Sequence, residues 1–197
     1  MTDDPRASTR RTAAVLTVSD SCSKGLREDL SGPAVARELD AAGFETVQRL
    51  TVPDEQSVLE DALRRAAGSA SLVVTTGGTG IAARDVTPEA TLAVCDRILP
   101  GIAELMRAEG RRQTPLAVLS RAVCGTRGAS VVLNLPGSPA GAISSLRAAL
   151  PVLPHALDLL AGGTEHGGPS ASGPPSEPSS GPASGPASGP ASDKGKG

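Results

Sequence analysis

The chain has 197 residues and a formal net charge of −2 at pH 7. That length allows one domain of ordinary size with residues to spare, and the balanced charge argues against binding to nucleic acid or to an anionic membrane. Phe44 is the only aromatic residue, so the stacking platforms that bind single-stranded nucleic acid are excluded as well.

The cysteines and the N-terminal residues bear on cellular location. The three cysteines are odd in number and widely spaced, which argues against a secreted disulfide framework and against a four-ligand zinc site: Cys22, Cys95 and Cys124. Residues 1–11 are polar and precede no apolar segment of signal-peptide or membrane-spanning type. We therefore expect a cytoplasmic protein without a membrane span.

Apolar periodicity predicts strands alternating with helices. In chain order, strands are expected at 13–18, 45–52, 72–76, 116–121 and 129–134. Residues 22–29 and 124–128 are expected to form loops, the second of them joining neighbouring strands as in a hairpin. Helices are expected at about 31–39, 53–66, 88–97, 101–111, 139–149 and 152–161. This alternation favours an α/β sandwich with a mostly parallel central sheet.

The two ends of the chain differ in composition from the middle. Residues 1–11 are expected to be a disordered lead, and residues 12–162 to be the folded domain. Residues 163–197 consist largely of Gly, Pro, Ser and Ala, and 181–192 are three tandem Gly-Pro-Ala-Ser units. Because no large apolar side chain follows Leu160, this segment is expected to be a disordered tail or linker.

A glycine-rich run follows the third predicted strand. Residues 77–80 read Gly-Gly-Thr-Gly, with Arg84 and Asp85 shortly after and with Thr87 and Pro88 placed as helix N-cap and first helical residue. Glycines let backbone N–H groups approach a ligand closely, and a helix N-terminus attracts anions. The run is neither a Walker loop nor a G-x-G-x-x-G fingerprint, and an ordinary strand-to-helix connection is an equally acceptable interpretation of the glycines alone.

Short polar side chains follow the other predicted strands. The carboxyl ends of parallel strands meet at one edge of a sheet, so these groups should converge: Ser19, Asp20, Asp29, Asp54 and Asn134. Each has a structural alternative, such as Asp54 acting only as a helix cap. Two or three carboxylates beside a glycine loop and an arginine suit Mg²⁺ bridging phosphate oxygens, and hence metal-assisted nucleotidyl transfer.

Several motifs resemble the molybdopterin-binding (MogA/MoaB) family. The strongest are Thr75–Gly80 with Arg84–Thr91, and further matches extend over roughly residues 13–160: Leu16–Cys22, Val52–Glu55, Leu119–Arg121, Val123–Gly125, Asn134–Ser138 and Leu150–Leu160. The last three look most like the N-terminal G domain of gephyrin.

The resemblance implies a three-layer α/β/α domain that acts as a homotrimeric molybdopterin adenylyltransferase with Mg²⁺, ATP and molybdopterin. It implies Asp54 and Asp85 as the catalytic carboxylates, which would also hold the metal. A downstream molybdenum insertase would be a partner. The residues expected to line the nucleotide and pterin pocket are Ser19, Asp20, Asp29, Thr76, Gly77, Gly78, Thr79, Gly80, Arg84, Ser120, Asn134, Pro136 and Gly137.

Two points qualify this assignment. Gly110 stands where the family pattern has a serine, which bears on pterin contacts from that helix end and not on the carboxylates. The alternative function is a non-catalytic molybdopterin-binding or scaffolding protein of the same fold. Retention of both Asp54 and Asp85 favours the enzyme, since a binder of an anionic ligand gains nothing from nearby carboxylates.

Overall fold

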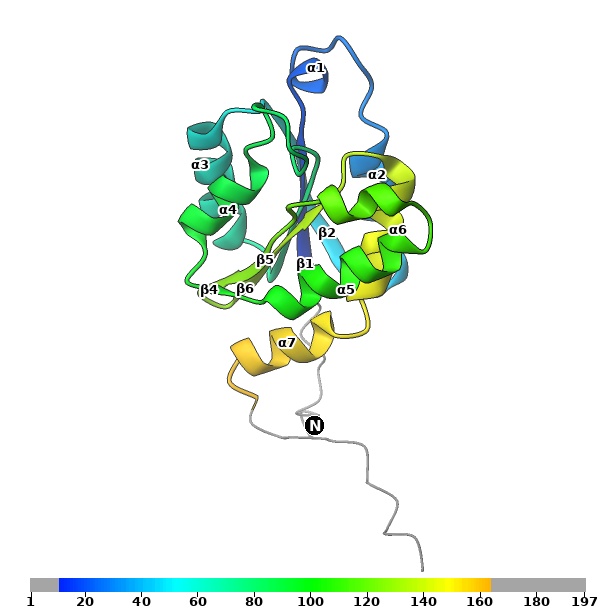
Figure 1. Cartoon of the computed structure of the whole chain (residues 1–197). Helices are drawn as coiled ribbons and strands as arrows, with labels where there is room; N and C mark the ends of the chain where they lie inside the picture. The colour runs from blue at the N-terminus through cyan, green and yellow to red at the C-terminus, as the bar shows by residue number, and fades with distance from the viewer. Residues whose placement is uncertain (1–10, 164–197) are drawn as a thin grey trace, which may run out of the picture. The chain divides into compact units, whose positions relative to one another are not determined.

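The computed structural model describes residues 11–163, so nearly all of the expected lead and tail lie outside the described residues. Within this range the chain forms one six-stranded sheet of order β2-β1-β3-β6-β5-β4 (Figure 1). The strands are β1 (Thr12–Val18), β2 (Glu45–Val52), β3 (Leu72–Thr76), β4 (Arg97–Ile98), β5 (Cys124–Arg127) and β6 (Ser130–Leu135). The first four strands in this order are parallel, and β5 pairs antiparallel with both β6 and β4.

The register of the parallel strands aligns their carboxyl ends. Val18 of β1 is opposite Val52 of β2, and Thr76 of β3 is opposite Leu135 of β6. The four connections that leave these strands therefore begin at the same edge of the sheet, where ligands bind in open α/β sheets.

Helices cover both faces of the sheet. They are α1 (Asp20–Ser23), α2 (Ser31–Ala41), α3 (Gln56–Ala67), α4 (Thr87–Val94), α5 (Pro100–Arg111), α6 (Pro139–Ala149) and α7 (Leu153–Leu160), together with the 3₁₀ helix η1 (Pro115–Leu119). α3 and α4 pack on one face, and α2, α5, α6 and α7 pack on the other (Figure 1). The expected three-layer α/β/α architecture is confirmed.

The central strands are apolar throughout because both of their faces are covered. In β1, Ala13 and Val15 face the cluster under α2 and α6, whereas Ala14 and Leu16 face the cluster under α3. All four are at most 1% exposed. Leu, Val and Ala thus fill both cores almost without aromatic side chains. No helix in the described part of the chain is long and apolar enough to cross a membrane.

The prediction of a strand at 116–121 is wrong. These residues form η1 and the turn after it, where Pro115 occupies the first turn and the Thr114 side chain accepts from the Leu116 N–H. The sheet instead gains β5 at 124–127, part of the span predicted as a loop. A tight turn with Gly128 at φ 53° joins β5 to β6. The expected connection of 116–121 to 129–134 through residues 124–128 is therefore wrong, because residues 124–127 themselves form the first strand of the hairpin.

Several helix boundaries also differ from prediction. α4 ends at Val94, and the next residues lead into β4. Thr87 is the first residue of α4 and makes no side-chain cap; its hydroxyl donates to the Gly77 carbonyl instead. Residues 20–23, partly assigned to a loop, form α1. The predicted cap at Ser138 is confirmed, because its hydroxyl accepts from the Gly141 N–H.

Candidate active site

The glycine loop after β3 is shaped by two residues with positive φ. Gly77 has φ 100° and Gly78 has φ 62°, a region that side-chain-bearing residues rarely adopt. A Cβ atom on Gly77 would lie 2.3 Å from the Val18 carbonyl oxygen, and one on Gly78 would lie 2.4 Å from the Thr87 hydroxyl. Thr87 also secures the loop, since its N–H donates to the Gly78 carbonyl at 3.1 Å. Both positions therefore require glycine.

Two carboxylates lie against this loop; one precedes the loop in the sequence and the other follows it. A Cβ atom on Gly78 would be 3.4 Å from Oδ1 of Asp54, and one on Gly80 would be 2.8 Å from Oδ2 of Asp85. Asp85 is held in turn by the Ala82 N–H, which donates to its Oδ2 at 2.8 Å. The missing side chains of the glycines thus leave room for the Asp54 and Asp85 carboxylates.

Asp54 is held by Asp20, the first residue of α1, and does not cap the helix that follows it, α3. The Asp20 N–H donates to Oδ2 of Asp54 at 2.8 Å, and the Asp54 N–H donates to Oδ1 of Asp20 at 3.1 Å. α3 begins at Gln56 and has no side-chain cap. This reciprocal pair brings together the ends of β1 and β2, and the cap interpretation of Asp54 is wrong. Asp20 also forms an ion pair with the exposed Arg84.

The electrostatics favour a cation at these carboxylates. Burial and the charge of Asp85 raise the pKa of Asp54 above its ordinary value of 3.8, which indicates that the two carboxylates repel each other. Residues 11–163 contain no cluster of three or more His, Cys, Asp or Glu side chains that could hold a metal by themselves. Mg²⁺ is commonly bound by one or two carboxylates together with substrate phosphates, and Asp54 and Asp85 fit that kind of site.

A polar recess of about 390 Å³ opens on one side of the glycine loop. Six of the predicted residues line it: Ser19, Asp29, Thr76, Gly77, Gly78 and Gly137. Asp29 forms part of its wall and is held by three donors, namely Thr17 Oγ1 at 2.7 Å, Ser31 Oγ at 3.3 Å and the Gly32 N–H at 2.9 Å. Because its oxygens already accept these bonds, Asp29 chiefly orders the start of α2.

A second, more apolar recess of about 280 Å³ opens on the other side of the loop. The predicted residues in it are Thr79, Gly80, Ser120 and Pro136, and its apolar lining includes Ala103, Met106, Leu116 and Leu119. Ser138 lines both recesses. Gly110 also lines this one, and a Cβ atom there would lie 2.8 Å from Cβ of Ala117, so η1 packs directly on the glycine.

The prediction that Asn134 lines the pocket needs correction. Its side chain is fully buried, and its Nδ2 donates to Thr75 Oγ1 at 3.0 Å and to Thr91 Oγ1 at 2.9 Å. Its Oδ1 accepts from the Val123 N–H at 3.1 Å. Asn134 therefore ties β3, α4 and the residue before β5 beneath the site. Asp20 and Arg84 also line neither recess, and instead meet beside Asp54.

Sequence reasoning missed Arg121 as a site residue. Its side chain donates to the carbonyls of Gly80, at 2.6 Å, and Asp85, at 2.5 Å, and pairs with Glu89 of α4. The hydrogen bond from Arg121 lowers the pKa of Glu89. The signals in the sequence were its position directly after Ser120 and its place in the family-like motif Leu119–Arg121, and neither indicated its partners across the fold.

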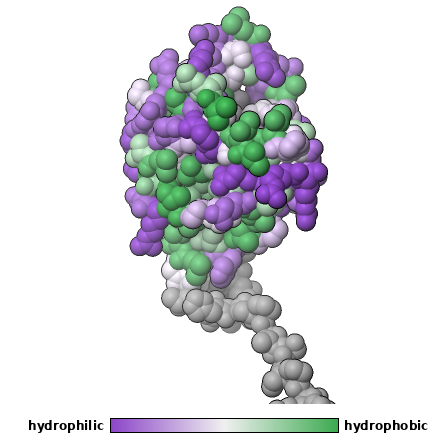
Figure 2. All heavy atoms as spheres, viewed as in Figure 1, coloured by the Kyte–Doolittle hydropathy of each residue, from purple (hydrophilic) through white to green (hydrophobic). Residues whose placement is uncertain are grey.

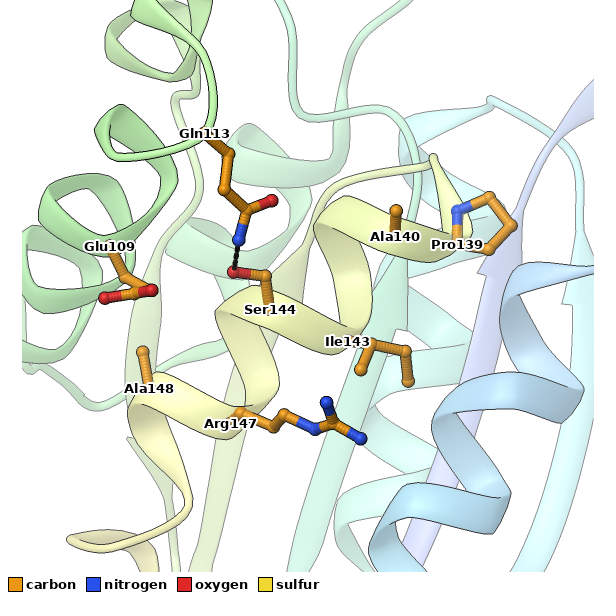
Figure 3. A pocket seen from close by; sticks show the side chains of 8 residues that line it. All are labelled: Glu109, Gln113, Pro139, Ala140, Ile143, Ser144, Arg147 and Ala148. Carbon is orange, nitrogen blue, oxygen red and sulfur yellow. Dashed lines mark hydrogen bonds between the residues drawn. The ribbon is translucent and has the colours of Figure 1, made fainter.

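A larger hollow than these two recesses lies elsewhere and contains none of the predicted residues. It is an open groove of about 750 Å³ on the outer surface of α5 and α6, where Gln113 donates to the Ser144 hydroxyl and Arg147 extends over Ile143 (Figure 3). Arg147 is paired with Glu38 of α2 at 2.7 Å. This groove is distinct from the strand ends that carry Asp54 and Asp85.

Comparison with known proteins identifies the family of the chain. The model of the probable molybdopterin-binding domain family matches residues 14–155. Molybdopterin adenylyltransferase of Helicobacter pylori is 43% identical over 152 residues, which cover 75% of this chain and 86% of the relative.

Solved structures give the same family. The molybdopterin biosynthesis enzyme MoaB from Thermus thermophilus is 49% identical with a TM-score of 0.73, covering 77% of this chain and 97% of that one. The tungsten cofactor synthesizing protein MoaB from Pyrococcus furiosus is 38% identical with a TM-score of 0.72, covering 78% and 99%. The chain therefore belongs to the molybdopterin-binding (MogA/MoaB) family.

Proposed function

We propose that this chain is a molybdopterin adenylyltransferase of molybdenum cofactor biosynthesis, which transfers AMP from ATP to the terminal phosphate of molybdopterin and releases pyrophosphate. The name of the 43% identical relative supports this activity. The observation that carries the proposal is the placement of Asp54 and Asp85 against the glycine loop. Residues of that loop line two recesses that could receive the two substrates, although the two carboxylates line neither recess.

In the proposed reaction an oxygen of the molybdopterin phosphate attacks the α-phosphorus of ATP. The new P–O bond forms as the bond to the β-phosphate oxygen breaks, and pyrophosphate leaves with the electron pair. The attacking phosphate is already ionised at neutral pH, so no strong general base is required. Orientation and charge neutralisation should supply most of the rate enhancement.

The chain's own groups suit these tasks. The Gly77 N–H donates to the Leu135 carbonyl at 3.1 Å, so the backbone N–H groups of residues 78–80 would be the ones to bind an anion. Arg84 adds a positive charge beside Asp20. Asp54 and Asp85 would hold Mg²⁺, which when bound neutralises phosphate charge. The reciprocal bonds between Asp20 and Asp54 keep the Asp54 carboxylate oriented.

The alternative is a non-catalytic molybdopterin-binding or scaffolding protein. A carboxylate whose pKa is raised by burial and by a second carboxylate is unfavourable both for folding and for docking an anionic pterin phosphate. Two carboxylates that repel each other are favourable at a position where a bound cation meets a reacting phosphate. The repulsion between Asp54 and Asp85 therefore supports the catalytic function over the scaffolding one.

The direct test is to mix the purified chain with ATP, Mg²⁺ and molybdopterin and to follow adenylated pterin by mass spectrometry. We expect product and pyrophosphate in equal amounts, and no product with Asp85→Asn. Arg64→Met is the matched control, because Arg64 pairs only with Glu60 and Asp61 on the exposed side of α3. Tight molybdopterin binding without any adenylated product would favour the scaffold.

Assembly, location and partners complete the proposal. We propose a homotrimer in the cytoplasm that passes its product to a molybdenum insertase, with the activity residing in residues 12–162. Hydrophobic residues lie between hydrophilic ones on the visible surface (Figure 2). Val47 and Leu50 of the edge strand β2 are 46% and 39% exposed, which supports association. Light scattering that finds only monomers at micromolar concentration would contradict the trimer.

A further inference from the structure

Arg121 binds both ends of the segment that carries Asp85. Its Nε donates to the Gly80 carbonyl at 2.6 Å, and its Nη2 donates to the Asp85 carbonyl at 2.5 Å. Its Nη1 pairs with Glu89, in the first turn of α4. The Arg121 N–H donates to the Thr79 carbonyl at 2.9 Å. Through these bonds a single residue contacts the glycine loop, the carboxylate segment and the following helix.

Between these anchor points the segment is held to the rest of the fold by the ion pair of Arg84 with Asp20. Residues 81–84 are exposed, and Ile81 is 69% exposed. Asp85 is restrained locally by the Ala82 N–H, at 2.8 Å from its Oδ2, and by its own N–H, which donates to the Ala82 carbonyl at 2.9 Å. An exposed turn of this kind opens easily unless its ends are fixed, and Arg121 fixes both ends.

Hydrogen bonds from α5 fix the backbone on both sides of Arg121. Arg107 of α5 donates from Nη1 to the carbonyls of Ser120, at 3.4 Å, and Ala122, at 3.2 Å. These carbonyls flank Arg121 in the chain, so α5 anchors its backbone while its side chain reaches to the loop. The planar guanidinium suits this role, because its fixed fork of donors can satisfy several acceptors in one geometry.

We propose that Arg121 is a positioning residue for adenylyl transfer, whose guanidinium fixes residues 80–85 so that the Asp85 carboxylate stays beside the glycine loop and toward Asp54. This inference rests on the proposed function. Each of its three side-chain nitrogens donates to a protein acceptor, so Arg121 acts through residues 80–85 and Glu89.

The test is Arg121→Met, which keeps an unbranched side chain and removes every donor. We expect kcat to fall by about a hundred-fold, the order that a small misplacement of a catalytic group costs, with a KM for molybdopterin close to that of the wild type. Exchange of the Ala82 amide, which reports on the bond to Asp85, should quicken. Arg64→Met, which removes a solvent-exposed arginine of α3, should leave kcat, KM and the exchange of the Ala82 amide unchanged.

Two further variants keep the inference open to refutation. Arg121→Lys retains the charge without the fork and should restore only part of kcat. If Arg121→Met does not fold, Glu89→Gln tests the positioning role instead, because it weakens the ion pair of Arg121 with Glu89 and leaves the bonds of Arg121 to the two carbonyls. A reduced kcat at unchanged KM would support the role, and an unchanged kcat would overturn it.

The two proposals fail in distinguishable ways. If the wild-type chain adenylates molybdopterin and Arg121→Met does so at the same kcat, the positioning role is wrong and the proposed function stands. If the wild-type chain forms no adenylated product, the proposed function is wrong and the role of Arg121 in it falls as well.

Discussion

Replacing Asp54 with asparagine should separate catalysis from folding. Asparagine has nearly the shape of aspartate and keeps a carbonyl oxygen that can accept the Asp20 N–H, which now lies 2.8 Å from Oδ2 of Asp54. It removes the negative charge that is opposed by burial and by Asp85. The substitution therefore preserves the local geometry and deletes the charge proposed to hold Mg²⁺.

The expected loss of activity is large. Removing a carboxylate that places a catalytic metal should lower kcat by about a thousand-fold or more, which corresponds to about 4 kcal/mol of transition-state stabilisation. A lost hydrogen bond would account for only about 1 kcal/mol, and that bond can be retained by asparagine. Molybdopterin binding should be unchanged or tighter, because one negative charge near an anionic ligand is gone.

Stability should change in the opposite direction. The pKa of Asp54 is raised in the folded state above its ordinary 3.8, so the folded state holds this proton more tightly than the unfolded chain does. Its contribution to stability is fully present below pH 3.8 and is lost as the pH rises through the folded value. Asp54→Asn should therefore unfold at the same or a higher temperature than the wild type at pH 7, and the difference should shrink toward pH 3.8.

Single-turnover adenylation, molybdopterin titration and thermal melts at several pH values measure these quantities on the same protein samples. Asp85→Asn serves as the companion variant, because it too keeps an acceptor for the Ala82 N–H. An Asp54→Asn protein that adenylates at nearly the wild-type rate would refute the proposed role of the carboxylate, however its stability changes. A protein that loses activity only because it unfolds would show a lower melting temperature at pH 7.

Three further outcomes are expected. Gly78→Ala should lower stability by about 1–3 kcal/mol in denaturant melts, because its φ is positive and the new Cβ would meet a threonine hydroxyl at 2.4 Å; an unchanged midpoint would contradict this. A chain ending at Gly163 should keep its melting temperature and assembly state. Burial raises the pKa of Cys95 to about 11 and that of Cys124 to about 12, so iodoacetamide at pH 8 should label Cys22 first in peptide maps.

Much of the fold followed from local signals in the sequence. The buried strands at 13–18 and 72–76 have continuous β-branched and apolar residues that only a doubly covered sheet accommodates. The second of them leads directly into Gly77 and Gly78, whose positive φ angles produce the turn. Because parallel strands end at one edge, polar residues after separate strands were expected to meet, and the reciprocal bonds between Asp20 and Asp54 have that origin.

The failures arose where tertiary contacts override local pattern. The apolar run at 116–119 resembles a strand, yet Pro115 starts a 3₁₀ turn there and leaves Leu116 and Val118 largely exposed. The short strand at Cys124–Arg127 forms because β6 offers a partner, which its polar sequence does not indicate. Asn134 resembled a pocket residue because it precedes a turn, but its amide is buried and donates hydrogen bonds to the hydroxyls of Thr75 and Thr91.

The glycines and the carboxylates of the site form one physical unit, although the sequence presents them as separate motifs. Oδ1 of Asp54 occupies the space beside the absent side chain of Gly78, and Asp85 does the same at Gly80. A Cβ on Gly80 would lie 2.8 Å from Oδ2 of Asp85 and would displace that carboxylate, whereas a Cβ on Gly78 would collide with the Thr87 hydroxyl at 2.4 Å and meet Asp54 only at 3.4 Å. Gly80 therefore makes room for a proposed catalytic carboxylate, and Gly78 makes room for the threonine that secures the loop. For this reason substitution at Gly80 should impair catalysis even in a variant whose backbone still folds, whereas substitution at Gly78 should act mainly through stability.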